Sequence, residues 1–373
     1  MRAIHDPATP ATCRPPRARW ARRLAGAATV LALAVGGLAQ TPSAAPQARV
    51  EPAGAFSIVV LPDTQGMVDD VNETTLLTMI QWILAEQASR RIAFVTHVGD
   101  VVEHGWLADE WARAAAALRL LDGRIPYSVA MGNHDYRGTG AFGSDTSAFR
   151  TFFGPAPRDG DPTTLAWSPN GLSHLQRFEA GGATYLHLSV EFEGGPVGDP
   201  DGALAWAKAV LTAHPDEPTI LTTHAYLWDE PGAEGLFPPH ARQGILRDED
   251  GVRFAGHDGQ QLYEALVAPF PQVFLVLCGH FHEAEGGGDG AFHRVTATPA
   301  GATVLEMLSD FQDYPRGGNG FLRIVTVVPG GGAAGLDRLE VETFSPLLQL
   351  DQRGPAYRFT VDLTLPRAPS TAR

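Results

Sequence analysis

The chain contains the stretch FSIVVLPDTQ at residues 56–65, an apolar run that ends in a carboxylate and an amide. A continuous run of this kind indicates a strand buried on both faces, as in a parallel sheet. Asp63 follows the strand directly, and Gln65 lies two residues further on. In α/β folds the carboxyl ends of such strands are the usual place for a functional site. This stretch therefore predicts both the fold class and the position of a site.

Strands and helices alternate along the chain after this stretch. Helices are predicted at residues 76–84, 108–121, 203–213 and 260–267, and strands at residues 92–96, 127–130, 183–189, 219–223 and 273–277. Such alternation predicts strand–helix–strand units with right-handed crossovers around a largely parallel sheet. Short β-rich segments follow His282, from residue 292 to residue 363. We interpret these later segments as the second sheet of a sandwich.

The first 45 residues differ from the rest of the chain. Five arginines between residues 14 and 23 precede an apolar run from residue 24 to residue 38, and small residues follow. This order is typical of a secretory signal peptide, and the run is short for a membrane-spanning helix of about 20 residues. We therefore expect residues 1–45 to be a signal peptide and processing region. The protein would be secreted or extracytoplasmic, without stable membrane insertion after processing; the alternative is an uncleaved N-terminal membrane anchor.

Composition indicates where the linker, the folded domain and the tail begin and end, and it disfavours one class of partner. Residues 46–54 form a Pro/Ala-rich linker, residues 55–364 the folded domain, and residues 365–373 an expected disordered tail. The folded domain contains one cysteine, Cys278, which cannot form an internal disulfide. The formal net charge of −14 and the single lysine argue against a nucleic-acid partner. The sequence makes no prediction of the oligomeric state.

Side chains that bind metals recur at the ends of the predicted strands. In chain order they are Asp63, Gln65, Asp100, Asn133, His224, His280 and His282. Mixed carboxylate, amide and imidazole donors suit Mn²⁺, Zn²⁺ or iron better than Ca²⁺. Their number is sufficient to hold two divalent ions side by side. Such an ion pair is the usual device for displacing a group at phosphorus.

Five motifs carry these donors: DTQ at 63–65, GD at 99–100, GNHD at 132–135, His224 and GHFH at 279–282. In this order and spacing the chain resembles the calcineurin-like metallophosphoesterase superfamily, of the bacterial secreted type, from residue 56 to residue 344. The resemblance implies a four-layer α/β/β/α sandwich with a dinuclear metal site at the strand C-terminal ends. Residues 55–364 would then be the metallophosphoesterase domain.

The same resemblance implies a role for each donor. The family has a histidine where this chain has Gln65, whose carbonyl oxygen can still ligate a metal as a weaker donor than imidazole. The implied cofactors are two divalent ions, drawn from Mn, Zn and Fe. The implied assignments are Asp100 as the bridge between the ions, Asp63 and His282 at one ion, and Asn133, His224 and His280 at the other.

The implied reaction is hydrolysis of a phosphomonoester or phosphodiester by in-line attack of a metal-bridging hydroxide. His134 would donate a proton to the leaving alkoxide or hold a phosphate oxygen, and Asp135 would orient the His134 imidazole and stabilise its charged form. Tyr226 and Trp228 are candidate substrate contacts, with simple packing as the open alternative. The expected substrate is a small or cell-surface phosphate ester. The alternative function is a catalytically weak or inactive surface-binding module on the same fold, a reading that only Gln65 supports.

Overall fold

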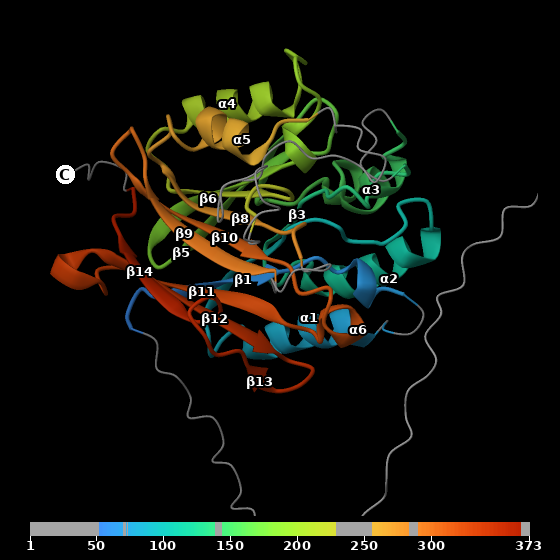
Figure 1. Cartoon of the computed structure of the whole chain (residues 1–373), viewed down its shortest axis with the longest axis horizontal. Helices are drawn as coiled ribbons and strands as arrows, with labels where there is room; N and C mark the ends of the chain where they lie inside the picture. Colours follow the sequence, from blue (N-terminus) through green and yellow to red (C-terminus); the bar gives the residue numbers. More distant parts are fainter. Residues whose placement is uncertain are drawn as a thin grey trace, which may run out of the picture. The chain divides into compact units, whose positions relative to one another are not determined.

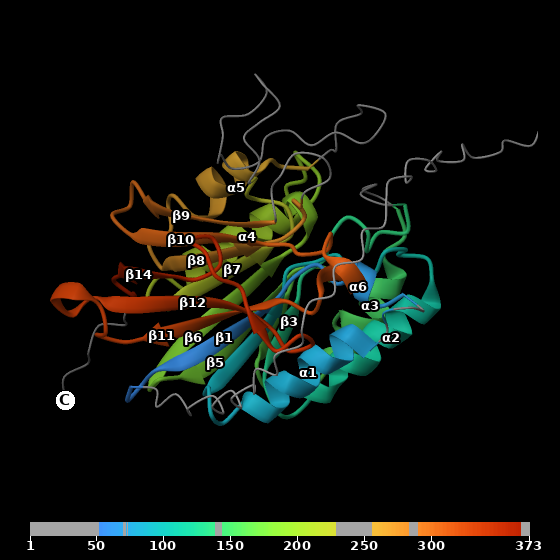
Figure 2. The ribbon, with the colours of Figure 1, turned by 60° about the horizontal axis from the view of Figure 1, so that its bottom comes forward.

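In a computed structural model, two seven-stranded sheets built from the described residues lie face to face, with helices on the outer face of each (Figures 1 and 2). The structure describes residues 52–69, 72, 74–138, 144–228, 256–282 and 290–366. The predicted signal peptide, most of the linker and the end of the predicted tail lie outside these residues. No helix in the described ranges combines the length and the apolar character of a membrane span.

The first sheet combines a parallel half with an antiparallel half. Its strand order is β13-β12-β11-β1-β2-β3, and β14 also pairs with β12. The parallel strands are β1 (Phe56–Leu61), β2 (Ile92–His97) and β3 (Tyr127–Val129). The antiparallel strands are β11 (Leu322–Val328), β12 (Asp337–Ser345), β13 (Leu350–Asp351) and β14 (Phe359–Leu363).

The second sheet has the order β4-β5-β6-β7-β8-β10-β9. Strands β6, β7, β8 and β10 run parallel, so their carboxyl ends meet at one edge. The strands are β4 (Thr164–Trp167), β5 (His174–Ala180), β6 (Ala183–Val190), β7 (Thr219–Thr223), β8 (Val273–Cys278), β9 (Ala291–Ala297) and β10 (Thr303–Ser309).

Helices cover both outer faces. The helices against the first sheet are α1 (Thr74–Glu86), α2 (Ala108–Leu118) and α3 (Ser147–Phe153). Those against the second are α4 (Ala203–Ala213) and α5 (Gly259–Leu266), and a short turn, α6 (Pro315–Gly318), lies near the site. Single-turn 3₁₀ helices span Gln65–Met67, Arg119–Leu121, Ala156–Arg158, Phe192–Gly194 and Ala333–Gly335.

Strand β1 explains why its sequence is apolar throughout. Val59 and Leu61 pack under the helices of the first layer, whereas Ile58 and Val60 pack between the two sheets. Successive strand residues point to opposite faces, and both faces of β1 are buried. Three stacked cores result: helix on sheet, sheet on sheet, and sheet on helix. The predicted four-layer α/β/β/α sandwich is confirmed.

The predicted assignment of the last strands to one second sheet is wrong. Strands β9 and β10 extend the sheet of β8, whereas β11 to β14 complete the sheet that begins with β1. Val325 of β11 lies opposite Ile58 of β1 in antiparallel register, which covers the free edge of that strand. Residue pattern alone predicts a strand but does not reveal which edge it will pair with. Strands β4, β5 and β13 were not predicted.

Candidate metal centre

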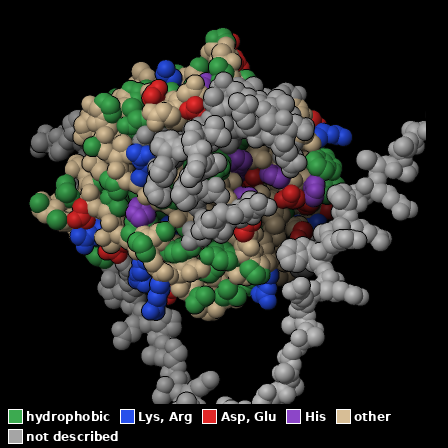
Figure 3. All heavy atoms as spheres, viewed as in Figure 1, with side chains coloured by type: hydrophobic (Ala, Val, Ile, Leu, Met, Phe, Trp, Pro, Cys, Tyr) green, Lys and Arg blue, Asp and Glu red, His purple; other side chains and the backbone are tan. Residues whose placement is uncertain are grey.

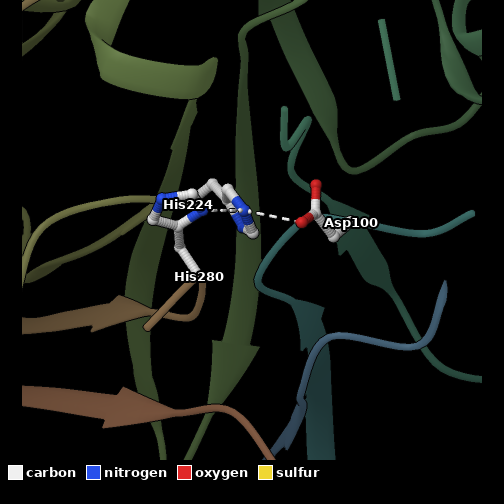
Figure 4. A group of neighbouring side chains, drawn as sticks. All are labelled: Asp100, His224 and His280. Atoms are coloured by element: carbon white, nitrogen blue, oxygen red, sulfur yellow. Dashed lines mark hydrogen bonds and ion pairs between the residues drawn. The ribbon is translucent and has the colours of Figure 1, made fainter. Parts of the chain in front are cut away.

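Three side chains converge on the Nε2 atom of His224. That nitrogen lies 3.1 Å from Oδ2 of Asp100, 3.0 Å from Oδ1 of Asn133 and 3.1 Å from Nδ1 of His280. Figure 4 shows the two imidazoles and the Asp100 carboxylate gathered at one point. Asp100 and Asn133 follow β2 and β3 of the first sheet, while His224 and His280 follow β7 and β8 of the second. The cluster is therefore assembled from both sheets.

This arrangement suits a metal ion better than a set of hydrogen bonds. An imidazole nitrogen either donates one hydrogen bond or accepts one, yet His224 Nε2 faces three electron-pair donors. A cation among them would engage all four groups. Among the described residues, one group of three His, Cys, Asp or Glu side chains brings its ligand atoms within 4.8 Å of one another, and it is Asp100, His224 and His280. The structure thus brings together most of one predicted site and the predicted bridge.

Asp63 and Gln65 lie beside this cluster with oxygen atoms that lack partners. Oδ2 of Asp63 accepts a hydrogen bond from the His280 amide at 3.0 Å and lies 3.9 Å from Nδ1 of His224. Nε2 of Gln65 donates to Oδ2 of Asp100 at 3.4 Å. Oδ1 of Asp63 and Oε1 of Gln65 are buried without a hydrogen-bond partner among the described residues. A buried polar atom without a partner is costly, and an ion between these oxygens would remove that cost.

His282 lies at the rim of the site, where Asp313 holds it. Nδ1 of His282 is 2.8 Å from Oδ2 of Asp313, and both side chains are partly exposed. Metal-binding histidines commonly donate one ring N–H to a carboxylate, which fixes the ring and increases the basicity of the other nitrogen. The Asp313 contact therefore suits His282 as a ligand through Nε2. In the space-filling view several histidine and acidic side chains share one depression of the surface (Figure 3).

Glycines before the ligands permit their close approach. A Cβ on Gly132 would lie 2.1 Å from Oδ1 of Asp100, and one on Gly279 would lie 1.9 Å from Oδ1 of Asp63. Two ligands are themselves in the left-handed region, Asp100 with φ 50° and His280 with φ 75°. Non-glycine residues in that region carry a cost that folded proteins tolerate mainly at functional sites.

Burial and neighbouring charges shift the pKa values of the ligands in different directions. Burial and nearby carboxylates raise the pKa of Asp63 well above its ordinary value. Burial would also raise the pKa of Asp100, but the His224 imidazole and other nearby imidazoles hold it below its ordinary value. Burial and His224 lower the pKa of His280 well below the usual range. An ionised Asp100 and a neutral His280 are the forms that bind metal.

Asp135 was predicted to orient the His134 imidazole, but its carboxylate bonds to backbone amides instead. Its carboxylate accepts hydrogen bonds from the backbone amides of Val101 at 2.9 Å, Val102 at 3.2 Å and Gly132 at 2.8 Å. Asp135 therefore ties together the loops after β2 and β3 and makes no hydrogen bond to the His134 imidazole. These amides occupy both oxygens of Asp135, and the His134 ring has the Glu103 carbonyl as its partner instead. Burial raises the pKa of Asp135 to about 7.

His134 is oriented instead by the backbone of Glu103. Nδ1 of His134 lies 3.0 Å from the Glu103 carbonyl oxygen and 3.6 Å from its Oε1. A carbonyl only accepts, so Nδ1 carries the hydrogen and donates. Burial would lower the pKa of His134, but Asp100 and the Glu103 carbonyl raise it above its ordinary value. The His134 amide also donates to Oδ1 of Asp100 at 2.8 Å, which ties this histidine to the cluster.

The two predicted substrate contacts have different positions. Tyr226 is fully buried, and its hydroxyl donates to Oε2 of Glu306 at 2.8 Å, so it packs in the core instead of lining a pocket. Trp228 is half-buried and packs on Phe281, with ring centroids 4.3 Å apart. Phe281 lies between His280 and His282 in the chain, so Trp228 is near the site. Its role in substrate binding stays a prediction.

Several groups outside the predicted ligand set support the site. His97 contacts Thr64 Oγ1 at 2.8 Å through Nε2 and the Gly99 amide at 3.1 Å through Nδ1, which links the loops of Asp63 and Asp100. Glu103 and Asp313 orient the two histidines described above. Asp313 follows β10 by four residues in a turn-rich segment, and no pattern in the sequence marks it as the partner of His282.

Residues 56–284 match the family described as calcineurin-like phosphoesterase, and the chain belongs to this family. Over 251 residues it is 28% identical to the uncharacterized protein YvnB of Bacillus subtilis (strain 168), an alignment that covers 63% of this chain and 16% of YvnB. The chain thus spans only a small part of the length of that relative.

Solved structures show similarity of fold at low sequence identity. Purple acid phosphatase PPD1 from yellow lupin (Lupinus luteus) seeds aligns with a TM-score of 0.50 and 13% identity, covering 86% of this chain and 57% of that one. GAP50, the anchor in the inner membrane complex of Plasmodium, aligns with a TM-score of 0.43 and 11% identity over 83% of this chain and 89% of that one. The lupin enzyme shares the layered architecture; at this identity the likeness concerns the fold alone.

Proposed function

We propose that this chain is a metal-dependent phosphoesterase that holds two divalent ions and hydrolyses a phosphomonoester or phosphodiester. The observation that carries the proposal is the convergence of a carboxylate, an amide oxygen and a second imidazole on His224 Nε2. The partnerless buried oxygens of Asp63 and Gln65 beside that cluster support a second ion. Membership of the calcineurin-like phosphoesterase family supports the reaction class.

The ligands divide between the two ions as the resemblance implies. Oδ2 of Asp100 lies 3.1 Å from His224 Nε2 and accepts from Gln65 Nε2 at 3.4 Å, so Asp100 contacts a proposed ligand of each ion, as a bridging carboxylate would. When bound, the ions supply Lewis acidity and a nucleophile at neutral pH. The proposed ligands are Asp63, Gln65 and His282 at the first ion, Asn133, His224 and His280 at the second, and Asp100 at both.

His134 is the proposed proton donor to the leaving group. Its Nδ1 hydrogen bonds to the Glu103 carbonyl, which leaves Nε2 to face the substrate. The raised pKa keeps the ring protonated at higher pH than usual, as a general acid requires. Asp135 acts on this histidine indirectly, because it fixes the backbone of the loop that carries Asn133 and His134.

The proposed substrate is a small or cell-surface phosphate ester. The net charge of −14 disfavours long nucleic acids, so bound ions must supply most of the attraction for phosphate. The arginine-rich start of the chain and the apolar run after it support export, either as a secreted protein or as one held by an N-terminal anchor.

The test is hydrolysis of an aryl phosphodiester and an aryl phosphomonoester by the full chain, with Mn²⁺, Zn²⁺ or iron added after chelation. We expect metal-dependent cleavage of at least one ester. Faster cleavage of the diester assigns a phosphodiesterase, and faster cleavage of the monoester assigns a phosphatase. Absence of cleavage with every metal would favour the alternative, a binding module on the same fold.

A further inference from the structure

Asp310 is a buried carboxylate that the mechanism above does not use. It follows β10, which pairs in parallel with β8 so that Leu308 lies opposite Cys278. Continuing this register by two residues places Asp310 level with His280. Asp310 therefore leaves the sheet at the same edge as the ligands of the site, from a sixth strand end. Its side chain is 0% exposed.

The neighbour of Asp310 across this edge is Asp63. Oδ1 of Asp63 lies so close to Gly279 that a Cβ there would be 1.9 Å away, and Oδ2 accepts from the His280 amide at 3.0 Å. The Asp63 carboxylate thus lies on the segment after β8, which is the strand next to Asp310. Burial contributes most to raising the pKa of Asp63, and the charge of Asp310 contributes more than any other neighbouring charge.

The hydrogen bonds of Asp310 leave one oxygen without a partner. Oδ1 accepts from the Gln312 amide at 3.0 Å, which fixes the carboxylate. Oδ2 is buried without a hydrogen-bond partner among the described residues, as are Oδ1 of Asp63 and Oε1 of Gln65. Within the described part of the chain Asp310 also forms no ion pair. Two neighbouring buried carboxylates are unfavourable unless a cation joins them.

We propose that Asp310 is a ligand of the first ion, together with Asp63, Gln65, His282 and the bridging Asp100. The inference rests on the proposed function, because it assumes that an ion binds there. Asp310 adds a negatively charged oxygen to a site in which Gln65 supplies a neutral one. Three carboxylates and a carbonyl oxygen beside one imidazole make this donor set better suited to Mn²⁺ than the imidazole-rich second site is.

The test is the binding of Mn²⁺ to the full-length protein, followed by the electron paramagnetic resonance signal of free Mn²⁺ after chelation and dialysis. We expect two sites in the unsubstituted chain. Asp310→Asn weakens one of them at least about tenfold and leaves the other unchanged. Asp337→Asn is the matched control, since Asp337 is 1% exposed and accepts from the amides of Gly330 and Leu365 away from these strand ends.

The outcomes separate this inference from the proposed function. Two sites of unchanged affinity in Asp310→Asn would overturn the role of Asp310 and leave the dinuclear site standing. Absence of Mn²⁺ binding by the unsubstituted chain would overturn both. Equal weakening of both sites in Asp310→Asn and Asp337→Asn would make Asp310 a structural residue, contrary to the proposal.

Thermal unfolding supplies a second readout. Without metal, removing the charge of Asp310 relieves repulsion with Asp63, so Asp310→Asn raises the midpoint of the metal-free protein. The further rise on adding Mn²⁺ becomes smaller than in the unsubstituted chain, because the ion binds less tightly. A variant with a lower midpoint without metal and an undiminished rise with Mn²⁺ would contradict the proposal.

Discussion

Oδ2 of Asp100 lies 3.1 Å from Nε2 of His224, although the two residues follow strands of different sheets. Asp100 follows β2 in the first sheet and His224 follows β7 in the second. Their contact exists only when the sheets are stacked in their native register. The site therefore depends on the whole sandwich, and an ion bound there would join its two halves. Ions that bind only the native state should raise its stability.

The close approach of Asp63 to the segment after β8 predicts the effect of Gly279→Ala. The added Cβ would lie 1.9 Å from Oδ1 of Asp63, so backbone or carboxylate must move. We expect the free energy of unfolding to fall by about 1–3 kcal/mol and Mn²⁺ affinity to fall with it. Gly123→Ala is the control for Mn²⁺ affinity, because its Cβ meets nothing within 4 Å and its φ of +67° strains the backbone without touching the site. Equal Mn²⁺ affinity in the two variants, measured by titration, would refute this account.

The contact between His282 and Asp313 predicts a graded loss of metal binding. Asp313→Ala removes the carboxylate 2.8 Å from Nδ1 of His282, so the ring is free to turn. Outer contacts of this kind contribute about 10–100-fold to metal affinity. Asp313→Asn keeps an acceptor oxygen and should recover part of the loss. Calorimetric titration with Mn²⁺ should give affinities that fall from the unsubstituted chain to Asp313→Asn and then to Asp313→Ala. An Asp313→Ala variant that binds as tightly as the unsubstituted chain would rule out a positioning role for Asp313.

The proposed role of His134 predicts a dependence on the leaving group. His134→Ala should lower kcat by about 100-fold or more for an alkyl phosphate ester, whose alkoxide needs a proton. For a nitrophenyl ester, which leaves without protonation, the loss should be much smaller. His104→Ala is the control, since His104 lies on the neighbouring loop after β2 and its Nδ1 contacts Oε1 of Glu110 in α2 at 2.9 Å. A His134→Ala loss of the same size for both esters would show that proton donation is not its role.

The lowered pKa of His174, a buried residue of β5 outside the candidate metal centre, predicts how the stability of the fold changes in acid. Burial and the nearby Arg158 lower its pKa to about 3, whereas the unfolded chain has a pKa of about 6.5. Between these values the unfolded state binds the extra proton, so stability falls as pH falls, by about 1.4 kcal/mol per pH unit from this residue. The loss begins below about pH 6.5 and is complete near pH 3.

His174→Gln should therefore reverse the order of stability with pH. At pH 7 the variant loses part of the contact between His174 Nε2 and Ser128 Oγ, which measures 2.8 Å, and should be about 1 kcal/mol less stable. Near pH 5 it should be the more stable protein, because it has no ring to protonate on unfolding. Urea unfolding of metal-free protein at both pH values measures this, and a stability difference that does not change with pH would contradict it.

Much of the fold could be predicted because its signals are local. The apolar run of β1 and the helical spacing before residue 84 each report a buried face, and strands followed helices in the expected order. Which of the two sheets a strand joins is not determined by local sequence. The sequence of β11 indicates a strand, but only packing determines that Val325 pairs with Ile58 and not with β10. Short edge strands such as β4 and β13 carry too few residues for a clear pattern.

The convergence of Asp100, Asn133, His224 and His280 could be predicted because each of these residues follows a strand end or a glycine. The hydrogen bonds that hold the candidate ligands and their neighbours in place could not be predicted, because they depend on which atoms meet after folding. Asp135 is an example: its position beside His134 suggested a His–Asp pair, but its carboxylate bonds to three backbone amides. Tyr226 is another, because a residue close to His224 in sequence lies with its hydroxyl on Glu306 in the core.

The central claim is that ions held at the His224 cluster carry out phosphoester hydrolysis. The most direct measurement compares the unsubstituted chain with Asn133→Ala in metal-dependent cleavage of an aryl phosphate ester. Asn133 places Oδ1 3.0 Å from His224 Nε2, and its loss should lower kcat/KM at least about 100-fold while circular dichroism and the thermal midpoint without metal stay close to those of the unsubstituted chain. An Asn133→Ala protein that folds and retains full metal-dependent activity would contradict the account.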